Sequence, residues 1–139
     1  MIRLVLLLLL IVLPARAQRQ MVVAAHPLAA EAGMAMLRAG GSALDAAIAT
    51  QAVLAVVEPQ ASGLAGGALL LHWDATAHRL AAWDGREVAP AAVSPGLFLR
   101  DGQPMPFYDA AIGGRAVGVP GAIRMLEAAH KEKGKLPWV

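Results

Sequence analysis

Apolar side chains recur at helical spacing soon after residue 26, and they predict a helix. Proline is tolerated in the first turn of a helix, so His26-Pro27 is a natural start. Gly40-Gly41 is expected to end it, with one glycine in the left-handed conformation that often follows a helix. The apolar positions near one face are Leu28, Ala32, Met36 and Leu37.

A second helix is predicted directly afterwards, from Ala43 to Val57. Ser42 can cap it, and Asp45 three residues later completes a capping-box-like pair. The stretch is apolar on nearly every side, and such a helix must be buried on several sides. Glu58-Pro59 ends it. Only a larger body could cover this helix, so we expect the chain to be part of a longer protein.

Two strands joined by a tight turn are predicted in the middle of the chain. A glycine-rich turn over residues 62–67 precedes the first strand, which runs from Ala68 to Trp73. The second strand runs from His78 to Trp83, so the pair is expected to form a hairpin. Asp84-Gly85 then closes the hairpin and presents Arg86-Glu87 at its end.

The last third of the chain is expected to contain an irregular part and then a helix. Residues 89–107 contain four prolines and no long period, which favours an ordered excursion with one turn of helix at Ser94-Pro95. Residues 116–119 are expected to form a short strand. A helix is then predicted from Pro120 to about Lys133, with Gly134 at its end. Two helices, a hairpin, a short strand and a final helix together predict an α/β fold with layers of both kinds.

The first seventeen residues have the three-part layout of a secretory signal peptide. A short basic start leads into an apolar run of ten residues, Leu4 to Leu13, and Ala15-Arg16-Ala17 offers a cleavage site of small residues. The run is too short to span a bilayer, which needs roughly 20 apolar residues. An uncleaved anchor or a buried strand is the alternative. We therefore expect residues 18–139 to be exported, to a periplasm or the exterior, without a stable membrane span.

Composition excludes several classes of function. The chain has no cysteine, which rules out disulfides, thiol catalysis and thiolate metal sites within it. The formal net charge is only +2, and no basic face carries interleaved aromatics, so nucleic acid is not an expected partner. Four histidines lack the paired spacing of metal ligands, so no metal site is expected. They are His26, His72, His78 and His130.

The glycine run at residues 63–67 also invites a functional interpretation. It lacks the Gly-x-Gly-x-x-Gly spacing and the Gly-Lys-Ser/Thr ending of nucleotide-binding loops, so we expect no nucleotide or other cofactor. Glycine instead allows close backbone packing, or backbone N–H groups that face an anion. The sequence alone leaves both of these roles open.

Arg86 is the sharpest candidate for chemistry. A guanidinium is a rigid fork of donors that matches a carboxylate with two hydrogen bonds. The end of a strand and the neighbouring Gly85 would let the backbone hold that fork at a site. The alternatives are a structural arginine paired with Glu87 or another acid, since structural ion pairs are common, and a solvated loop residue. Glu58 and Asp84 could form a carboxylate pair, although roles at a helix end and in a turn explain them equally well.

Seven short segments follow one another in order after the signal-like stretch. They are His26-Pro27-Leu28-Ala29-x-Glu31-Ala32-Gly33, Gly40-Gly41-Ser42-Ala43-x-Asp45-Ala46-Ala47, Val57-Glu58-Pro59, Ser62-Gly63-Leu64, Asp84-Gly85-Arg86-Glu87-x-Ala89-Pro90, Gly118-Val119-Pro120-Gly121 and Gly134-Lys135-Leu136-Pro137-Trp138. Each is weak alone. Together, in this order and at this spacing, they resemble the gamma-glutamyltransferase (glutathione hydrolase) family.

The resemblance implies an N-terminal-nucleophile hydrolase with an αββα sandwich, of which this chain would hold an incomplete part. Such an enzyme is made as an inactive precursor that cuts itself, and a threonine freed at the new N-terminus attacks the gamma-glutamyl amide. That threonine lies well downstream in the family, so no catalytic residue is expected in this chain. By resemblance, Arg86 binds the alpha-carboxylate of the substrate, in agreement with its fork chemistry.

The resemblance further implies that residues 18–139 are the N-terminal part of the large subunit. The abrupt stop after Pro137-Trp138 favours an incomplete gene model, and the sequence leaves open whether Val139 is a true end. The full-length enzyme would transfer or hydrolyse the gamma-glutamyl group of glutathione and related amides through an acyl-enzyme. Its partners would be that substrate, the remainder of the large subunit and the small subunit. A cephalosporin or glutaryl acylase of the same family and a non-catalytic exported binding module are the alternatives.

Overall fold

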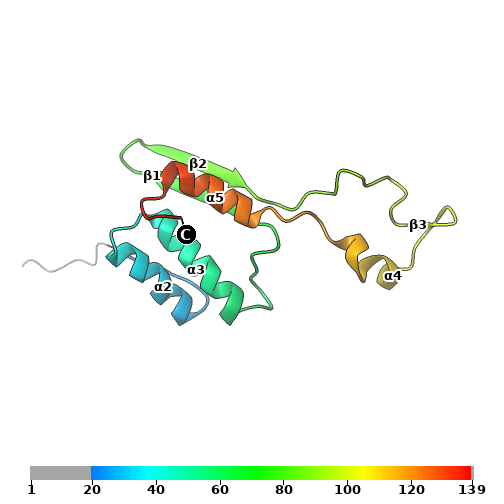
Figure 1. Cartoon of the computed structure of the whole chain (residues 1–139), viewed down its shortest axis with the longest axis horizontal. Helices are drawn as coiled ribbons and strands as arrows, with labels where there is room; N and C mark the ends of the chain where they lie inside the picture. The colour runs from blue at the N-terminus through cyan, green and yellow to red at the C-terminus, as the bar shows by residue number, and fades with distance from the viewer. Residues whose placement is uncertain (1–19, 139) are drawn as a thin grey trace, which may run out of the picture.

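The computed structural model describes residues 20–138, so the predicted signal peptide lies outside the described residues. A helical hairpin of α2 (Pro27–Arg38) and α3 (Ala43–Val57) forms one side of the body. Helix α5 (Ala122–Lys133) lies between α3 and a two-stranded sheet (Figure 1). The structure is therefore mixed α/β, as the sequence predicts.

Helices α2 and α3 begin and end where the sequence predicts. The His26 side chain caps α2 by accepting a hydrogen bond from the Leu28 N–H at 3.2 Å. Gly40 follows α2 with a φ of 88°, in the left-handed region that favours glycine. Ser42 and Asp45 form a complete capping box at the start of α3, because each side chain accepts from the backbone N–H of the other.

The predicted hairpin is present, with both strands displaced by one residue. Strand β1 (Leu69–Asp74) pairs with β2 (Arg79–Asp84) in antiparallel register, so that Leu69 lies opposite Asp84. His78 belongs to the turn, not to β2, because its φ is 50°. The turn is stabilised by the Asp74 carboxylate, which accepts from the next backbone N–H groups, those of Thr76 and Ala77.

Helix α5 supplies most of the small core. It begins two residues after Pro120 and ends before Gly134, close to the predicted bounds. The helix contacts α3 on one side and strand β2 of the hairpin on the other. The buried apolar residues of the described chain are Ala29, Leu44, Ala46, Ala122, Met125, Leu126 and Ala129. No helix in residues 20–138 has the length and apolar character needed to cross a membrane.

Residues 90–117 form an arm that extends away from this body (Figure 1). The helical turn predicted at Ser94-Pro95 is wrong, because that stretch forms non-helical turns. The strand predicted at residues 116–119 is also wrong, since only Val119 forms a bridge, with Val88. The arm holds elements that the sequence analysis missed: β3 (Leu99–Arg100), β4 (Gln103–Pro104), α4 (Phe107–Ala111) and the 3-10 helix η1 (Gly114–Ala116).

The hairpin is covered on one face only. Side chains at alternate positions, such as Leu70 and Trp83, are partly buried on the face toward α5. The opposite face is apolar and open, with its large side chains between 57 % and 73 % exposed. They are Leu69, Leu71, Trp73 and Leu80. In a longer protein, this exposed apolar face could be buried by further chain packed against it.

Candidate functional site

Arg86 lies two residues beyond the end of β2, on a backbone that is held firmly. The hairpin ladder continues past β2, because Gly85 and Ala68 exchange backbone hydrogen bonds of 2.9 and 3.2 Å. The Arg86 N–H then donates to the Asp84 carboxylate at 2.8 Å. These bonds fix the position of the backbone that carries the Arg86 side chain.

Three segments that are far apart in sequence meet around Arg86. The start of α5 is joined to the glycine run, because the Gly66 carbonyl accepts from the N–H groups of Gly121 at 3.1 Å and Ala122 at 3.0 Å. The segment after Arg86 is joined to the approach to α5 by the Val88–Val119 bridge, with bonds of 3.3 and 2.8 Å. Residues 66–68, 85–88 and 119–122 therefore form one continuous backbone cluster.

Glycines allow this cluster to be compact. A Cβ atom on Gly67 would lie 3.0 Å from the Cα of Arg86 and would collide with the Glu87 carboxylate. A Cβ atom on Gly85 would lie 2.5 Å from the Cβ of Met125 on α5. The contact at Gly85 is closer than real Cβ atoms make, and the contact of Gly67 with the Arg86 Cα is already tight. Gly67 therefore serves the close backbone packing that was one of its two predicted roles.

The Arg86 side chain is exposed and free within the described chain. Its guanidinium makes no hydrogen bond or ion pair with any of residues 20–138. The neighbouring Glu87 carboxylate instead lies beside Gly66 and Gly67. The structural pairing of Arg86 with Glu87 is therefore not formed, and the fork of donors remains available to a ligand with a planar carboxylate.

The other acidic candidates have local roles. Asp84 accepts from the Arg86 N–H, and Glu58 accepts from the side chain of Gln60 two residues later. These contacts match the turn and helix-end roles that the sequence allowed for them. Within residues 20–138, no group of three His, Asp or Glu side chains is close enough together to hold a metal ion.

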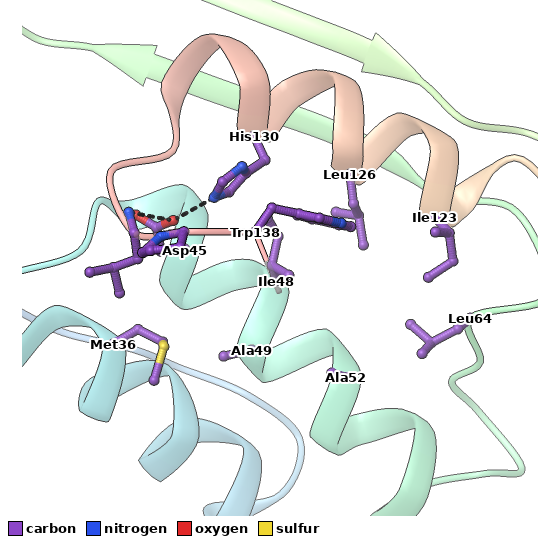
Figure 2. Close-up of a pocket in the computed structure, with 12 residues that line it drawn as sticks. Met36, Asp45, Ile48, Ala49, Ala52, Leu64, Ile123, Leu126, His130 and Trp138 are labelled. Atoms are coloured by element: carbon purple, nitrogen blue, oxygen red, sulfur yellow. Dashed lines mark hydrogen bonds and ion pairs between the residues drawn. The ribbon is translucent and has the colours of Figure 1, made fainter. Parts of the chain in front are cut away.

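A pocket of about 350 Å³ lies between α3, α5 and the segment that follows α5. Figure 2 shows that its wall is mostly apolar, with Ile48 and Leu126 on facing helices and the Trp138 side chain between those helices. The residues that line it do not include Arg86. The pocket and the Arg86 cluster are thus separate features of the molecule.

Asp45 and His130 close one end of this pocket with a contact that sequence reasoning missed. The His130 Nε2 atom lies 3.1 Å from an Asp45 carboxylate oxygen, and their side chains are only 13 % and 4 % exposed (Figure 2). Asp45 also accepts from the backbone N–H of Lys135 at 3.0 Å and of Leu136 at 3.4 Å. Sequence spacing gave no signal for this, because the partners are about ninety residues apart.

The pKa of the Asp45 carboxyl lies below its ordinary value. Burial acts to raise this pKa, but the hydrogen bonds donated by the Ser42 backbone and hydroxyl and by the backbone N–H groups of Lys135 and Leu136 lower it by more in sum. The carboxylate is thus ionised in the fold, and it ties the start of α3 to the segment after α5.

Comparison with known proteins identifies relatives for nearly all of the described chain. The sequence pattern of the family described as Gamma-glutamyltranspeptidase matches residues 29–139. The glutathione hydrolase proenzyme of Bacillus subtilis (strain 168) is 44 % identical over 115 residues, which cover 82 % of this chain and 20 % of that protein. The chain thus spans about a fifth of the length of this curated relative.

Solved structures agree with the sequence comparison. A gamma-glutamyltranspeptidase from Pseudomonas nitroreducens, complexed with L-DON, matches with a TM-score of 0.80 and 32 % identity, over 88 % of this chain and 36 % of that one. A cephalosporin acylase from Bacillus halodurans matches with a TM-score of 0.70 and 34 % identity, over 89 % of this chain and 24 % of that one. Because the family pattern covers most of its length, this chain belongs to the gamma-glutamyltranspeptidase family.

Proposed function

We propose that this chain forms the substrate-carboxylate site of a gamma-glutamyltransferase, with Arg86 as the binding residue. The observation that carries the proposal is a guanidinium with no partner among the described residues, on a backbone fixed by three converging segments. A bidentate arginine contact holds a carboxylate in a defined orientation, which a flexible or already paired arginine could not do. The alpha-carboxylate of a gamma-glutamyl group is a ligand of this kind.

The full-length enzyme would carry out acyl transfer in two steps. A threonine outside residues 20–138 would attack the gamma-glutamyl carbonyl and form an acyl-enzyme, which water or an acceptor amine would then resolve. Arg86 would hold the far end of the gamma-glutamyl group throughout, so that the carbonyl stays in place for attack. Glutathione hydrolysis by relatives of this chain supports this assignment.

The exposed hairpin face supports an αββα architecture for the full-length enzyme. Helices cover one face of β1 and β2, whereas Leu71, Trp73 and Leu80 on the other face are open. A second sheet packed on that face would bury these side chains and complete two layers of strands between layers of helices. Side chains on the open face of β2 come from every second residue, Leu80, Ala82 and Asp84, and Arg86 is the next position in this series. Arg86 would therefore lie at the edge of the interface between the two sheets.

A cephalosporin or glutaryl acylase is the second candidate function, and similarity to the cephalosporin acylase from Bacillus halodurans favours keeping it. A glutaryl group retains the terminal carboxylate of a gamma-glutamyl group but lacks the amino group. Arg86 could therefore serve either enzyme, and recognition of the amino group would distinguish them. A non-catalytic exported binding module is the third possibility, and it would lack acyl transfer altogether.

The experiment uses the full-length enzyme, meaning a complete enzyme that carries residues 20–138 of this chain, either from its own gene or as a chimera with the Bacillus subtilis relative. Its kcat/KM is measured on gamma-glutamyl and glutaryl p-nitroanilides, with and without glycylglycine as acceptor. Faster turnover of the gamma-glutamyl substrate supports the proposal. Faster turnover of the glutaryl substrate would assign an acylase, and no turnover of either would leave the binding module.

We also propose that the protein is exported after cleavage between Ala17 and Gln18. The apolar run and the small residues before Gln18 support this. N-terminal sequencing of the mature protein should therefore begin at Gln18, and the protein should be recovered from the periplasm or the medium. A mature protein that retains Met1 would refute the proposal.

A further inference from the structure

We infer that Gly121 is a positioning residue for Arg86, and this inference rests on the proposed function of Arg86. Gly121 lies just before α5 and directly against the peptide that joins Gly85 to Arg86. A Cβ atom at this position would collide with the Gly85 carbonyl oxygen and lie 2.8 Å from the Gly85 carbonyl carbon. It would also lie 3.0 Å from the Arg86 carbonyl oxygen. All of these obstacles are backbone atoms, which cannot rotate aside.

The requirement for glycine at residue 121 is one of space and not of backbone conformation. Gly121 has a φ of −119° and a ψ of −16°, which residues with side chains also adopt. Gly40 differs in this respect, because its φ of 88° disfavours any side chain while the space around it is open. Substitution of Gly121 therefore changes the distance between α5 and the Gly85–Arg86 peptide without adding conformational strain.

The Arg86 side of this contact is the side expected to move. The start of α5 is anchored, because Gly121 and Ala122 both donate to the Gly66 carbonyl and Ala122 is buried in the core. The Gly85–Arg86 peptide is also hydrogen-bonded, through Gly85 to Ala68 and through the Arg86 N–H to Asp84, but it leads to the exposed residue Arg86 and so has room to shift toward solvent. A methyl group on residue 121 would thus push the Arg86 backbone, and the guanidinium attached to it, toward solvent.

A shift of this size would impair catalysis even in a variant that folds. Opening the closest contacts to ordinary van der Waals distance requires a displacement of up to about 1 Å, and a misplacement of that order can cost about 100-fold in rate. A purely structural role would instead reduce the amount of folded enzyme and leave its KM unchanged. A positioning role predicts a higher KM, and only for a substrate that carries the alpha-carboxylate. A structural role predicts an unchanged KM for both substrates.

The test compares variants of the full-length enzyme on gamma-glutamyl p-nitroanilide and on 4-aminobutanoyl p-nitroanilide, which lacks the alpha-carboxylate. Gly121→Ala is the principal variant, and Arg86→Ala is the reference for complete loss of the contact. Gly96→Ala is the matched control, since a Cβ there meets nothing closer than 3.9 Å. Ala129→Gly is the stability control, because Ala129 is fully buried in α5 away from Arg86. Thermal melts and subunit processing report folding for each variant.

We expect Gly121→Ala to raise KM for the gamma-glutamyl substrate by about tenfold or more, with a much smaller change on the 4-aminobutanoyl substrate. Ala129→Gly should lower the melting temperature without changing KM, and Gly96→Ala should change neither. If Gly121→Ala does not fold, Gly67→Ala presses on the Cα of Arg86 from another segment and should show the same dependence on the carboxylate.

Two outcomes would overturn the inference, and they differ from failure of the proposed function. An unchanged KM in folded Gly121→Ala enzyme, or equal losses on the two substrates, would show that Gly121 does not position Arg86. If Arg86→Ala still shows a loss that depends on the carboxylate, the proposed function survives. If Arg86→Ala shows no such loss, the proposed function fails, and the inference fails with it.

Discussion

Asp45 illustrates how one buried side chain can join distant parts of the chain. It caps α3 locally through Ser42, and it also accepts from Lys135 and Leu136 beyond the end of α5. The His130 Nε2 atom also lies 3.1 Å from the Asp45 carboxylate. A carboxylate in this position is stabilised only while these donors surround it, because burial alone would favour its neutral form.

The lowered pKa of Asp45 has a defined effect on stability. The fold favours the ionised carboxylate, so its pKa in the folded state lies below the ordinary value of 3.8 that applies to the unfolded chain. The stabilisation is therefore complete above that ordinary value and is lost as pH falls through the lower folded value. The relevant window is below about pH 4, where the unfolded chain takes up a proton before the folded one does.

We predict that Asp45→Asn lowers the free energy of unfolding of the full-length enzyme by about 1–3 kcal/mol at pH 7, as expected when buried hydrogen-bond donors lose a charged acceptor. Urea denaturation at pH 7 and at pH 3.5 measures it, and the difference from wild type should shrink at the lower pH. Glu127→Gln is the control, because its ion pair with Lys131 lies on an exposed helix face and should matter little. A difference that does not vary with pH would contradict this account.

At the scale of elements, the hairpin has an apolar face without a partner in residues 20–138. Leu71 is 71 % exposed on that face, so its side chain gains little from the described part of the fold. In an αββα sandwich the same side chain would be buried between two sheets. The cost of truncating Leu71 should therefore depend on how much of the enzyme is present.

We predict that Leu71→Ala destabilises the full-length enzyme by about 2–5 kcal/mol, the usual cost of emptying a buried leucine site. In a segment of residues 20–138, which is not expected to unfold cooperatively, the same substitution should leave the rate of limited proteolysis unchanged, because the side chain is exposed there. Denaturant unfolding of the full-length pair and proteolysis of the segment pair give the comparison. Equal effects in both contexts would argue against a second sheet on this face.

Elements whose ends are set by local chemistry could be predicted from the sequence. The capping box of Ser42 and Asp45 and the left-handed Gly40 are determined by neighbours in sequence, so α2 and α3 were predicted closely. The arm was not, because its prolines hide the short hairpin at residues 99–104, and contacts such as Arg115 with the Leu97 carbonyl stabilise it. The one-residue error in β2 came from the positive φ of His78, which the strand pattern does not reveal.

In the candidate site too, features set by local sequence were predicted, and contacts between distant segments were not. Arg86 was predicted from residue type, strand end and family resemblance, and the structure adds that its side chain is free among residues 20–138. The close approach of Gly121 to Arg86 could not be predicted, because it depends on how α5 meets the hairpin. The Asp45–His130 contact was missed for the same reason, since its partners lie at opposite ends of the described chain.

At the scale of the whole molecule, the described chain has a small core and a large apolar surface. Seven apolar residues are buried, whereas side chains as large as Phe107, Tyr108 and Leu69 are more than 70 % exposed. Helix α3 also leaves Val56 open to solvent. Apolar surface on this scale is typical of a segment that is covered by further chain.

We predict that residues 20–138, expressed alone, neither turn over gamma-glutamyl p-nitroanilide nor unfold cooperatively. The activity is missing because the proposed threonine nucleophile lies outside this segment, and the weak folding follows from the exposed apolar faces. A continuous assay, a thermal melt and binding of a hydrophobic dye check both parts. A soluble monomer with a sharp melt would contradict the folding part, and measurable turnover would contradict the catalytic part.

The most direct test of the central claim compares Arg86 and Arg86→Ala enzymes on substrates with and without the alpha-carboxylate. On gamma-glutamyl p-nitroanilide we expect the variant to lose about 2–5 kcal/mol of binding. That loss should appear mainly as a higher KM, because the contact is present in ground and transition states alike. On 4-aminobutanoyl p-nitroanilide the loss should be small, and Arg86→Lys should recover only part of the first loss. Equal losses on both substrates would show that Arg86 does not bind the carboxylate and has a structural role instead.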